Sequence, residues 1–178
     1  AQEGGSFLDP MCCSATMFLE GAMMAADFAP GLLREYYGFL GWKKHDNALW
    51  QSLLTNAQQR REIGLAKMPV IVGFDQDRRT VATALQHVEN DASAAESWPK
   101  GLIACNPPYG ERLGDEAETA ELYRRFGEVL KSRFGGWQAA MIISNPELGF
   151  RLGIRSQKPI TLFNGALECK LLRFNIEE

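Results

Sequence analysis

The stretch "LIACNPPYGERLG", residues 102–114, decides the fold of this chain. Its first four residues form a short apolar run bounded by turn residues, which predicts a buried β-strand. Pro107 and Pro108 must end this strand, because a proline cannot donate a hydrogen bond to a neighbouring strand. Asn106 and Tyr109 therefore lie on a rigid turn at the carboxyl end of a strand, the edge at which open α/β sheets bind their ligands.

Strands and helices alternate on both sides of this stretch, which predicts an α/β fold. We expect a three-layer, Rossmann-like sheet that is mostly parallel and closes with a C-terminal antiparallel hairpin, whose turn is the Asn164-Gly165 dipeptide. The expected strands span residues 6–9, 69–75, 102–105, 137–144 and the hairpin over 158–176. The expected helices span residues 16–26, with Thr16 as its cap, 77–90 and 118–134. Only eleven residues separate Asn90 from Leu102, which is little room for a further strand.

Residues 27–68 are predicted to form a helical insertion between two of the strands. Pro and Gly residues punctuate its first half, and residues 46–67 predict one long helix. Leu49 and Leu53 share one face of that helix, as expected for a packed amphipathic element. Trp42 and Trp50 are expected to pack the insertion onto the helices of the sheet.

The bulk properties of the chain indicate one globular domain. Its 178 residues, 46% of them hydrophobic, suffice for a single core. No apolar run reaches the roughly 20 residues that cross a bilayer, so we expect a cytoplasmic protein without a membrane partner. The four cysteines lack metal-binding spacing, and the net charge of −3 gives no overall nucleic-acid signature.

Three polar side chains end neighbouring strands of the predicted sheet: Asp9, Asp75 and Asn106. An acid at the end of a second strand commonly binds the hydroxyls of a ribose, and the turn after a first strand offers backbone N–H groups to a charged ligand. Each residue alone is equally well explained as a turn former or helix cap. Together they favour a nucleoside-bearing cofactor.

The Asn-Pro-Pro-Tyr turn is suited to methylating an exocyclic base amine. Such an amine is a poor nucleophile because its lone pair is delocalised into the ring. The side-chain oxygen of Asn106 and the carbonyl of Pro107 offer two acceptors for the amine hydrogens, held by a stiffened backbone. Tyr109 is placed to stack on a flipped-out base. The alternative is a rigid loop with a buried tyrosine.

Three stretches together resemble one family: "NPPYGERLG" (106–114), "FLDPMCCSATMFLEGAMMAADFAPG" (7–31) and "GFLGWKKHDNALWQ" (38–51). The chain resembles the bacterial large-subunit (23S) ribosomal RNA guanine-N2 methyltransferases, specifically the amino-terminal enzyme half of the bifunctional RlmKL type. The resemblance covers essentially the whole chain. It implies a class I methyltransferase that uses S-adenosylmethionine and releases S-adenosylhomocysteine.

The resemblance also assigns residues by matching positions. The cofactor-binding residues it implies are Asp9, Met11, Cys12, Ser14 and Thr16 around the methionine part, Asp75 at the ribose and Asp91 near the adenine amine. The catalytic turn it implies is Asn106, Pro107, Pro108 and Tyr109, with Tyr109, Glu111 and Arg112 toward the RNA. The chain departs from the family pattern where Cys13 and Ala15 replace glycines. A Cβ there crowds the cofactor or strains the turn.

Full-length members of this family carry an RNA-binding THUMP module before the first strand and a second methyltransferase domain after this one. Neither is in the sequence, so we expect residues 1–178 to be a single catalytic domain of a longer protein. The expected activity is methyl transfer to the N2 amine of a guanine in large-subunit ribosomal RNA. The alternatives are adenine-N6 methylation of DNA or RNA, glutamine methylation of a protein, and an inactive docking domain. A dinucleotide oxidoreductase is disfavoured, because no G-x-G-x-x-G follows the first strand.

Overall fold

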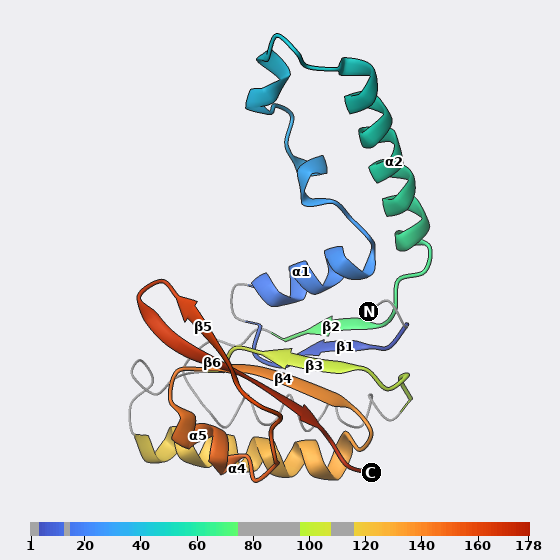
Figure 1. Cartoon of the computed structure of the whole chain (residues 1–178). Helices are drawn as coiled ribbons and strands as arrows, with labels where there is room; N and C mark the ends of the chain where they lie inside the picture. Colours follow the sequence, from blue (N-terminus) through green and yellow to red (C-terminus); the bar gives the residue numbers. More distant parts are fainter. Residues whose placement is uncertain (1–3, 13–14, 75–96, 108–115) are drawn as a thin grey trace.

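The computed structural model describes residues 4–12, 15–74, 97–107 and 116–178. Six strands form one sheet (Figure 1): β1 (Phe7–Asp9), β2 (Ile71–Gly73), β3 (Leu102–Cys105), β4 (Gln138–Ile143), β5 (Ile160–Asn164) and β6 (Leu167–Asn175). The α-helices are α1 (Thr16–Ala25), α2 (Asn47–Leu65), α4 (Glu116–Arg133) and α5 (Pro146–Arg151), with short 3-10 turns η1 (Pro30–Leu33) and η2 (Gly38–Gly41). The predicted helix over residues 77–90 lies outside the described residues.

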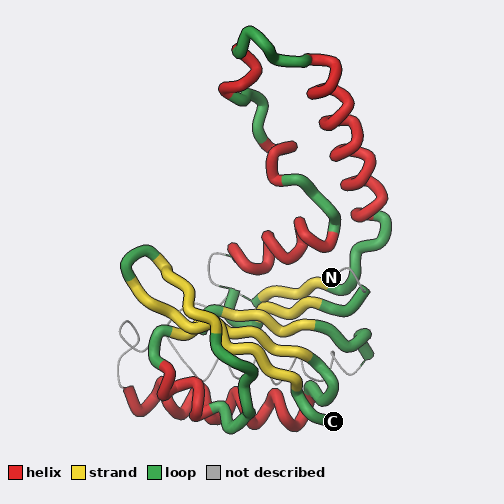
Figure 2. Tube along the Cα trace, in the orientation of Figure 1, coloured by secondary structure: helices red, strands yellow, loops and turns green. Residues whose placement is uncertain are grey.

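The sheet has the strand order β2-β1-β3-β4-β6-β5. The first four strands in this order are parallel, and β6 pairs antiparallel with both β4 and β5. Figure 2 shows the hairpin of β5 and β6 leaving the plane of the parallel strands. Its two-residue turn is Gly165-Ala166, one position after the predicted Asn164-Gly165 dipeptide, because Asn164 is still paired with Leu167 as the last residue of β5. Gly165 adopts a positive φ of 63° that side chains disfavour. The predicted fold, a mostly parallel sheet with a C-terminal antiparallel hairpin, is confirmed.

Helices cover both faces of the sheet. α4 and α5 lie against one face, and α1 lies against the other over β1 and β2 (Figure 1). The buried core is formed by one side of α4 and the strands beneath it. Its largest fully buried members include Phe126, Leu130, Ile103 and Met141. Burying side chains of this size is the main favourable contribution to the stability of such a domain.

The short helix α5 is an element that the sequence analysis did not anticipate. Asn145 is its N-cap, and the Asn145 side-chain oxygen accepts a hydrogen bond of 2.9 Å from the backbone N–H of Glu147. Pro146 occupies the first turn, where a missing N–H costs nothing. The Asn-Pro pair after β4 was the sequence signal for this helix.

An arm, defined here as residues 27–68, leaves the sheet between α1 and β2 and extends well beyond it (Figure 1). Asp46 caps α2 by accepting a hydrogen bond of 3.0 Å from the Leu49 N–H, but no residue of α2 is buried. The prediction that Trp42 and Trp50 pack the arm onto the helices of the sheet is wrong, because both rings lie against Phe39 within the arm itself. The side chains of Leu49 and Trp42 are 58% and 72% exposed. None of the helices within the described part of the chain has the length and hydropathy needed to cross a membrane.

The junction of β1 and β3 depends on a glycine. A Cβ added at Gly101 would overlap the backbone carbonyl oxygen of Ser6, and the Leu102 N–H donates a hydrogen bond of 2.8 Å to that same oxygen. The two chains can approach this closely only because Gly101 has no side chain. This contact fixes the pairing of the two strands.

We therefore predict that Gly101→Ala lowers the free energy of unfolding by roughly 1–3 kcal/mol, because the overlap is with backbone that cannot rotate away. Urea unfolding followed by circular dichroism measures this. Gly38→Ala is the matched control, since a Cβ at Gly38 meets nothing within 4 Å. Equal stabilities of the two variants would contradict the proposed packing.

Candidate functional site

Three parallel strands end side by side at one edge of the sheet. We call this the carboxyl edge. It consists of Asp9 at the end of β1 with the loop that follows through Cys12, Phe74 after β2, and Asn106 with Pro107 after β3. Asp9 is paired with Gly73 of β2, and the preceding Leu8 is paired with Ile103 of β3. The sheet therefore brings Asp9 and Asn106, which are far apart in the sequence, to neighbouring strand ends.

The loop after β1 is tied to the end of β2 by backbone hydrogen bonds. The Cys12 N–H donates to the Phe74 carbonyl at 2.8 Å, and the Phe74 N–H donates to the Asp9 carbonyl at 3.0 Å. Within the loop, the Met11 N–H donates to the Asp9 carboxylate at 3.3 Å. The loop is thus held in place by the sheet before any ligand binds, and it leads directly into α1.

Ala15 occupies the N-cap of α1 in a strained conformation. Its φ of 58° and ψ of 18° lie in the left-handed region, and no side-chain hydrogen bond caps the helix there. The prediction that Thr16 caps this helix is wrong: Thr16 is its first helical residue. Ala15 is one of the two positions at which the sequence resemblance implies a glycine, and a left-handed backbone of this kind favours glycine.

Asp9 is a buried carboxyl group. Its side chain is only 1% exposed. Burial raises the pKa of Asp9 to about 6, and the hydrogen bond from the Met11 backbone lowers it in part. Cys105, at the end of β3, is fully buried, and this burial, with the charge of nearby Asp9, raises the pKa of its thiol far above the usual range. Cys105 is therefore an inert core residue, whereas Asp9 can change its charge near neutral pH.

The first half of the predicted catalytic turn has the expected position. Asn106 is exposed directly after β3, while Pro107 is buried and so anchors the backbone beside it. Several predicted site residues fall outside the described residues: Cys13, Ser14, Asp75, Asp91, Pro108, Tyr109, Glu111 and Arg112. In the described part of the chain, no group of His, Cys, Asp or Glu side chains has the makings of a metal site.

Sequence reasoning missed Gly73, which sets the position of α1 above the carboxyl edge. A Cβ at Gly73 would lie 2.6 Å from the ring of Phe18, so its absence lets α1 pack closely on β2. A lone glycine within the β-branched run "PVIVGFD" was the signal, because glycine in a strand often marks a close approach.

Comparison with known families gives one match over nearly the whole chain. The family model described as "RMKL-like, methyltransferase domain" matches residues 1–173. Among curated proteins, the ribosomal RNA large subunit methyltransferase K/L of Methylococcus capsulatus is 52% identical over 99% of this chain. That of Allochromatium vinosum is 46% identical over 99%. The chain spans 26% of the length of each of these relatives.

Solved structures agree with this relationship. SMU.472, described as a methyltransferase and crystallised with SAH, superposes with a TM-score of 0.69 and 26% identity. It covers 98% of this chain, which corresponds to 48% of that protein. A structure described as a predicted N6-adenine-specific DNA methylase from Listeria monocytogenes gives a TM-score of 0.73, with 26% identity over 97% of this chain and 47% of that one. The complex with SAH agrees with the cofactor expected from the sequence.

The strain at Ala15 leads to a stability prediction. Ala15→Gly should raise the free energy of unfolding by about 1 kcal/mol, because glycine adopts a φ of 58° without the steric penalty of a Cβ. Ala22→Gly, in the interior of the same helix, is the matched control and should lower it by about 1 kcal/mol. Urea titrations of both variants measure this. Destabilisation of the same size in both would show that Ala15 is unstrained.

The raised pKa of Asp9 leads to a pH-dependence prediction. The native state holds the Asp9 proton up to about pH 6, whereas the unfolded chain releases it near the ordinary aspartate pKa of 3.8. The wild type should therefore lose stability relative to Asp9→Asn as the pH rises from about 4 to about 6, with a constant difference above that. Unfolding free energies of both proteins across this range test it, and parallel profiles would contradict it.

Proposed function

Because the chain belongs to the family of RMKL-like methyltransferase domains, we propose that it transfers a methyl group from S-adenosylmethionine to an exocyclic amine of a ribosomal RNA base at the carboxyl edge. One observation carries this proposal. Asn106, an exposed amide on a buried proline anchor, ends a strand adjacent to the one that ends in Asp9. A cofactor bound over the Asp9 loop would then have its reactive methyl group beside the Asn106 turn.

The described residues of the carboxyl edge fit the cofactor. S-adenosylmethionine supplies, when bound, an electrophilic methyl group on a positively charged sulfur. Burial raises the pKa of Asp9 and so disfavours its ionised form, which a cationic ligand nearby would stabilise. The loop of Asp9, Met11 and Cys12 is preorganised by its hydrogen bonds to β2. We propose that Ser14 and Thr16 contact the methionine part of the cofactor, Asp75 the ribose and Asp91 the adenine.

The Asn106 turn would prepare the amine for attack. The Asn106 side-chain oxygen and the Pro107 carbonyl accept one amine hydrogen each, which favours a pyramidal nitrogen with a localised lone pair. The nitrogen then bonds to the methyl carbon as the carbon–sulfur bond breaks, and the electron pair of that bond stays on sulfur. The amine loses one proton to water, so no strong base is needed beforehand. Positioning and hydrogen bonding provide the catalysis.

We propose the N2 amine of guanine as the target, with Tyr109 stacking on the base and Glu111 and Arg112 facing the RNA. The support is the sequence resemblance together with the curated relatives, which are named as ribosomal RNA large subunit methyltransferases. Adenine N6 is the second candidate, because the Listeria structure carries that description at 26% identity. Glutamine methylation and an inactive docking domain lack a supporting observation of this kind.

The chain spans 26% of the length of two of its curated relatives. We propose that the whole protein joins this domain to an RNA-binding THUMP module and a second methyltransferase domain. Affinity for RNA depends largely on positive charge, and this chain has a net charge of −3, which supports a contribution to RNA binding from other parts of the protein.

Nucleoside analysis of the methylated product identifies the target. Protein-free large-subunit ribosomal RNA is incubated with the chain and isotopically labelled S-adenosylmethionine, digested, and separated by mass spectrometry. Labelled N2-methylguanosine supports the proposal. Labelled N6-methyladenosine would replace it with the second candidate, and label in protein but not RNA would contradict it.

We predict that Asn106→Ala lowers methyl transfer by on the order of 10²-fold or more, since it removes one of the two acceptors for the amine. Its affinity for S-adenosylmethionine should stay unchanged, because Asn106 contacts the base. Asn145→Ala is the matched control, because it removes the side-chain amide of another Asn-Pro pair after a strand, the one that caps α5. This variant should keep full activity. Turnover of the Asn106 variant at the wild-type rate would contradict the mechanism.

A further inference from the structure

The far end of the arm is organised by aromatic side chains in mutual contact, one pair stacked and the others edge-to-face or tilted. We call Tyr37, Phe39, Trp42, His45 and Trp50 the tip cluster. The Phe39 ring lies 5.3 Å from Tyr37 and 5.0 Å from Trp50, measured between ring centroids, with Trp42 and His45 at 6.4 and 5.8 Å. The Tyr37 hydroxyl donates a 2.7 Å hydrogen bond to the Gly31 carbonyl. These contacts make the tip a small core of its own, separate from that of the sheet.

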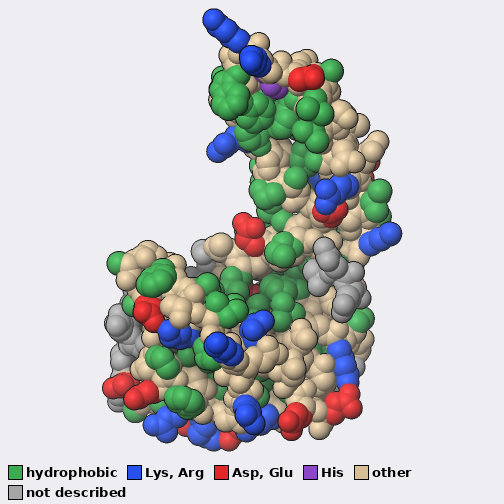
Figure 3. All heavy atoms as spheres, in the orientation of Figure 1, with side chains coloured by type: hydrophobic (Ala, Val, Ile, Leu, Met, Phe, Trp, Pro, Cys, Tyr) green, Lys and Arg blue, Asp and Glu red, His purple; other side chains and the backbone are tan. Residues whose placement is uncertain are grey.

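The outer side of the tip cluster combines exposed rings with exposed lysines. Trp42 is 72% exposed although it is held against Phe39, and Tyr36 nearby is 65% exposed. Lys43 and Lys44 follow Trp42 directly and are exposed. No ion pair holds either lysine among the residues that the structure describes. Figure 3 shows these features together at the end of the arm: basic side chains in blue next to hydrophobic ones in green.

The charge of the arm is opposite to that of the rest of the chain. The arm carries six Lys and Arg residues against four Asp and Glu, a net charge of +2 in a chain of net charge −3. An electropositive projection on an acidic domain marks the place where a polyanion meets the least repulsion. If the exposed rings of the arm instead bound a protein through apolar contacts, the positive charge of the arm would not be needed.

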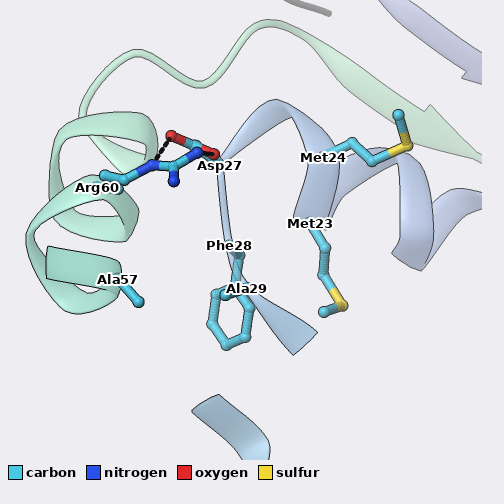
Figure 4. Close-up of a pocket in the computed structure, with 7 residues that line it drawn as sticks. All are labelled: Met23, Met24, Asp27, Phe28, Ala29, Ala57 and Arg60. Carbon is cyan, nitrogen blue, oxygen red and sulfur yellow. Dashed lines mark hydrogen bonds and ion pairs between the residues drawn. The ribbon is translucent and has the colours of Figure 1, made fainter. Parts of the chain in front are cut away.

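The base of the arm is fixed to the end of α1. Arg60 of α2 donates two hydrogen bonds to the Asp27 carboxylate, at 2.7 and 2.6 Å, beside a hollow also lined by Met23 and Phe28 (Figure 4). The Arg61 guanidinium lies 4.8 Å from the centroid of the Phe28 ring. Gly64 allows α2 to approach the Ala26 carbonyl where a Cβ would overlap it. These contacts join the base of α2 to the end of α1.

We propose that the tip of the arm binds RNA, with Trp42 stacking on an unpaired base and Lys43 and Lys44 contacting the adjoining phosphates. Single-stranded nucleic acid is commonly bound by aromatic side chains interleaved with cations, because each base can stack on a ring and each backbone phosphate carries a negative charge. A rigid platform also limits the entropy lost on binding. The inference deepens the proposed function, on which its biological setting rests, by adding a substrate contact remote from the carboxyl edge.

Fluorescence anisotropy with a labelled single-stranded RNA oligonucleotide, titrated with the 178-residue chain at several salt concentrations, tests this. Lys43→Ala with Lys44→Ala should weaken binding about ten-fold and reduce the slope of log K against log salt by about 1.4, as expected for two lost phosphate contacts on a single strand. Trp42→Ala should weaken binding about ten-fold with the slope unchanged, and Trp42→Phe should restore most of the affinity.

Lys131→Ala with Lys158→Ala is the matched control, because it removes the same charge from exposed positions outside the arm. It should change affinity less than two-fold. RNA affinity that is unchanged in the tip variants would overturn the proposal and leave the tip as a surface for protein. If the tip variants keep their RNA affinity and methylate RNA at the wild-type rate, RNA binding by the tip is refuted while the proposed methyltransferase function stands. If RNA binding depends on the tip but no methylation is found, the proposed function is refuted while RNA binding by the tip stands.

Discussion

The close pairing of β1 with β3 is the constraint on which the rest of the structure depends. Gly101 lets the backbone of β3 meet that of β1 at Ser6, so Asp9 and Asn106 end neighbouring strands although some hundred positions separate them in the sequence. A residue with a side chain at Gly101 would separate the two strands. The Asp9 loop, proposed to bind the cofactor, and the Asn106 turn, proposed to bind the base, would then no longer lie side by side.

The loop after β1 combines strain with preorganisation. Backbone hydrogen bonds from Cys12 and Phe74 hold it against β2, while Ala15 enters α1 in a left-handed conformation. Strained backbone persists only where its surroundings over-determine it, and it is found most often at ligand sites. Burial raises the pKa of Asp9, at the start of this loop, to about 6, so a cationic cofactor bound nearby would stabilise the ionised form that burial disfavours.

Much of this could be predicted from the sequence, because strand ends and turns are local features. The prolines after Asn106 predict the end of β3, and the Asn-Gly pair predicts the hairpin turn to within one residue. The arm could not be placed in this way, since the periodicity of Leu49 and Leu53 indicates an apolar face but not whether anything covers it. The pKa of Asp9 depends on burial between strands that meet only in the fold. The sequence predicts Thr16 as a cap, because residue propensity cannot reveal that Ala15 before it adopts a left-handed conformation.

Calorimetric titration of the chain with S-adenosylmethionine tests the central claim most directly, because the claim requires the Asp9 loop to hold cofactor with Ala15 in place of glycine. The account predicts saturable binding of one molecule in the micromolar range, competed by S-adenosylhomocysteine. Absence of binding under conditions where the chain is folded would contradict it, and would mean that the carboxyl edge of this domain is not a working cofactor site.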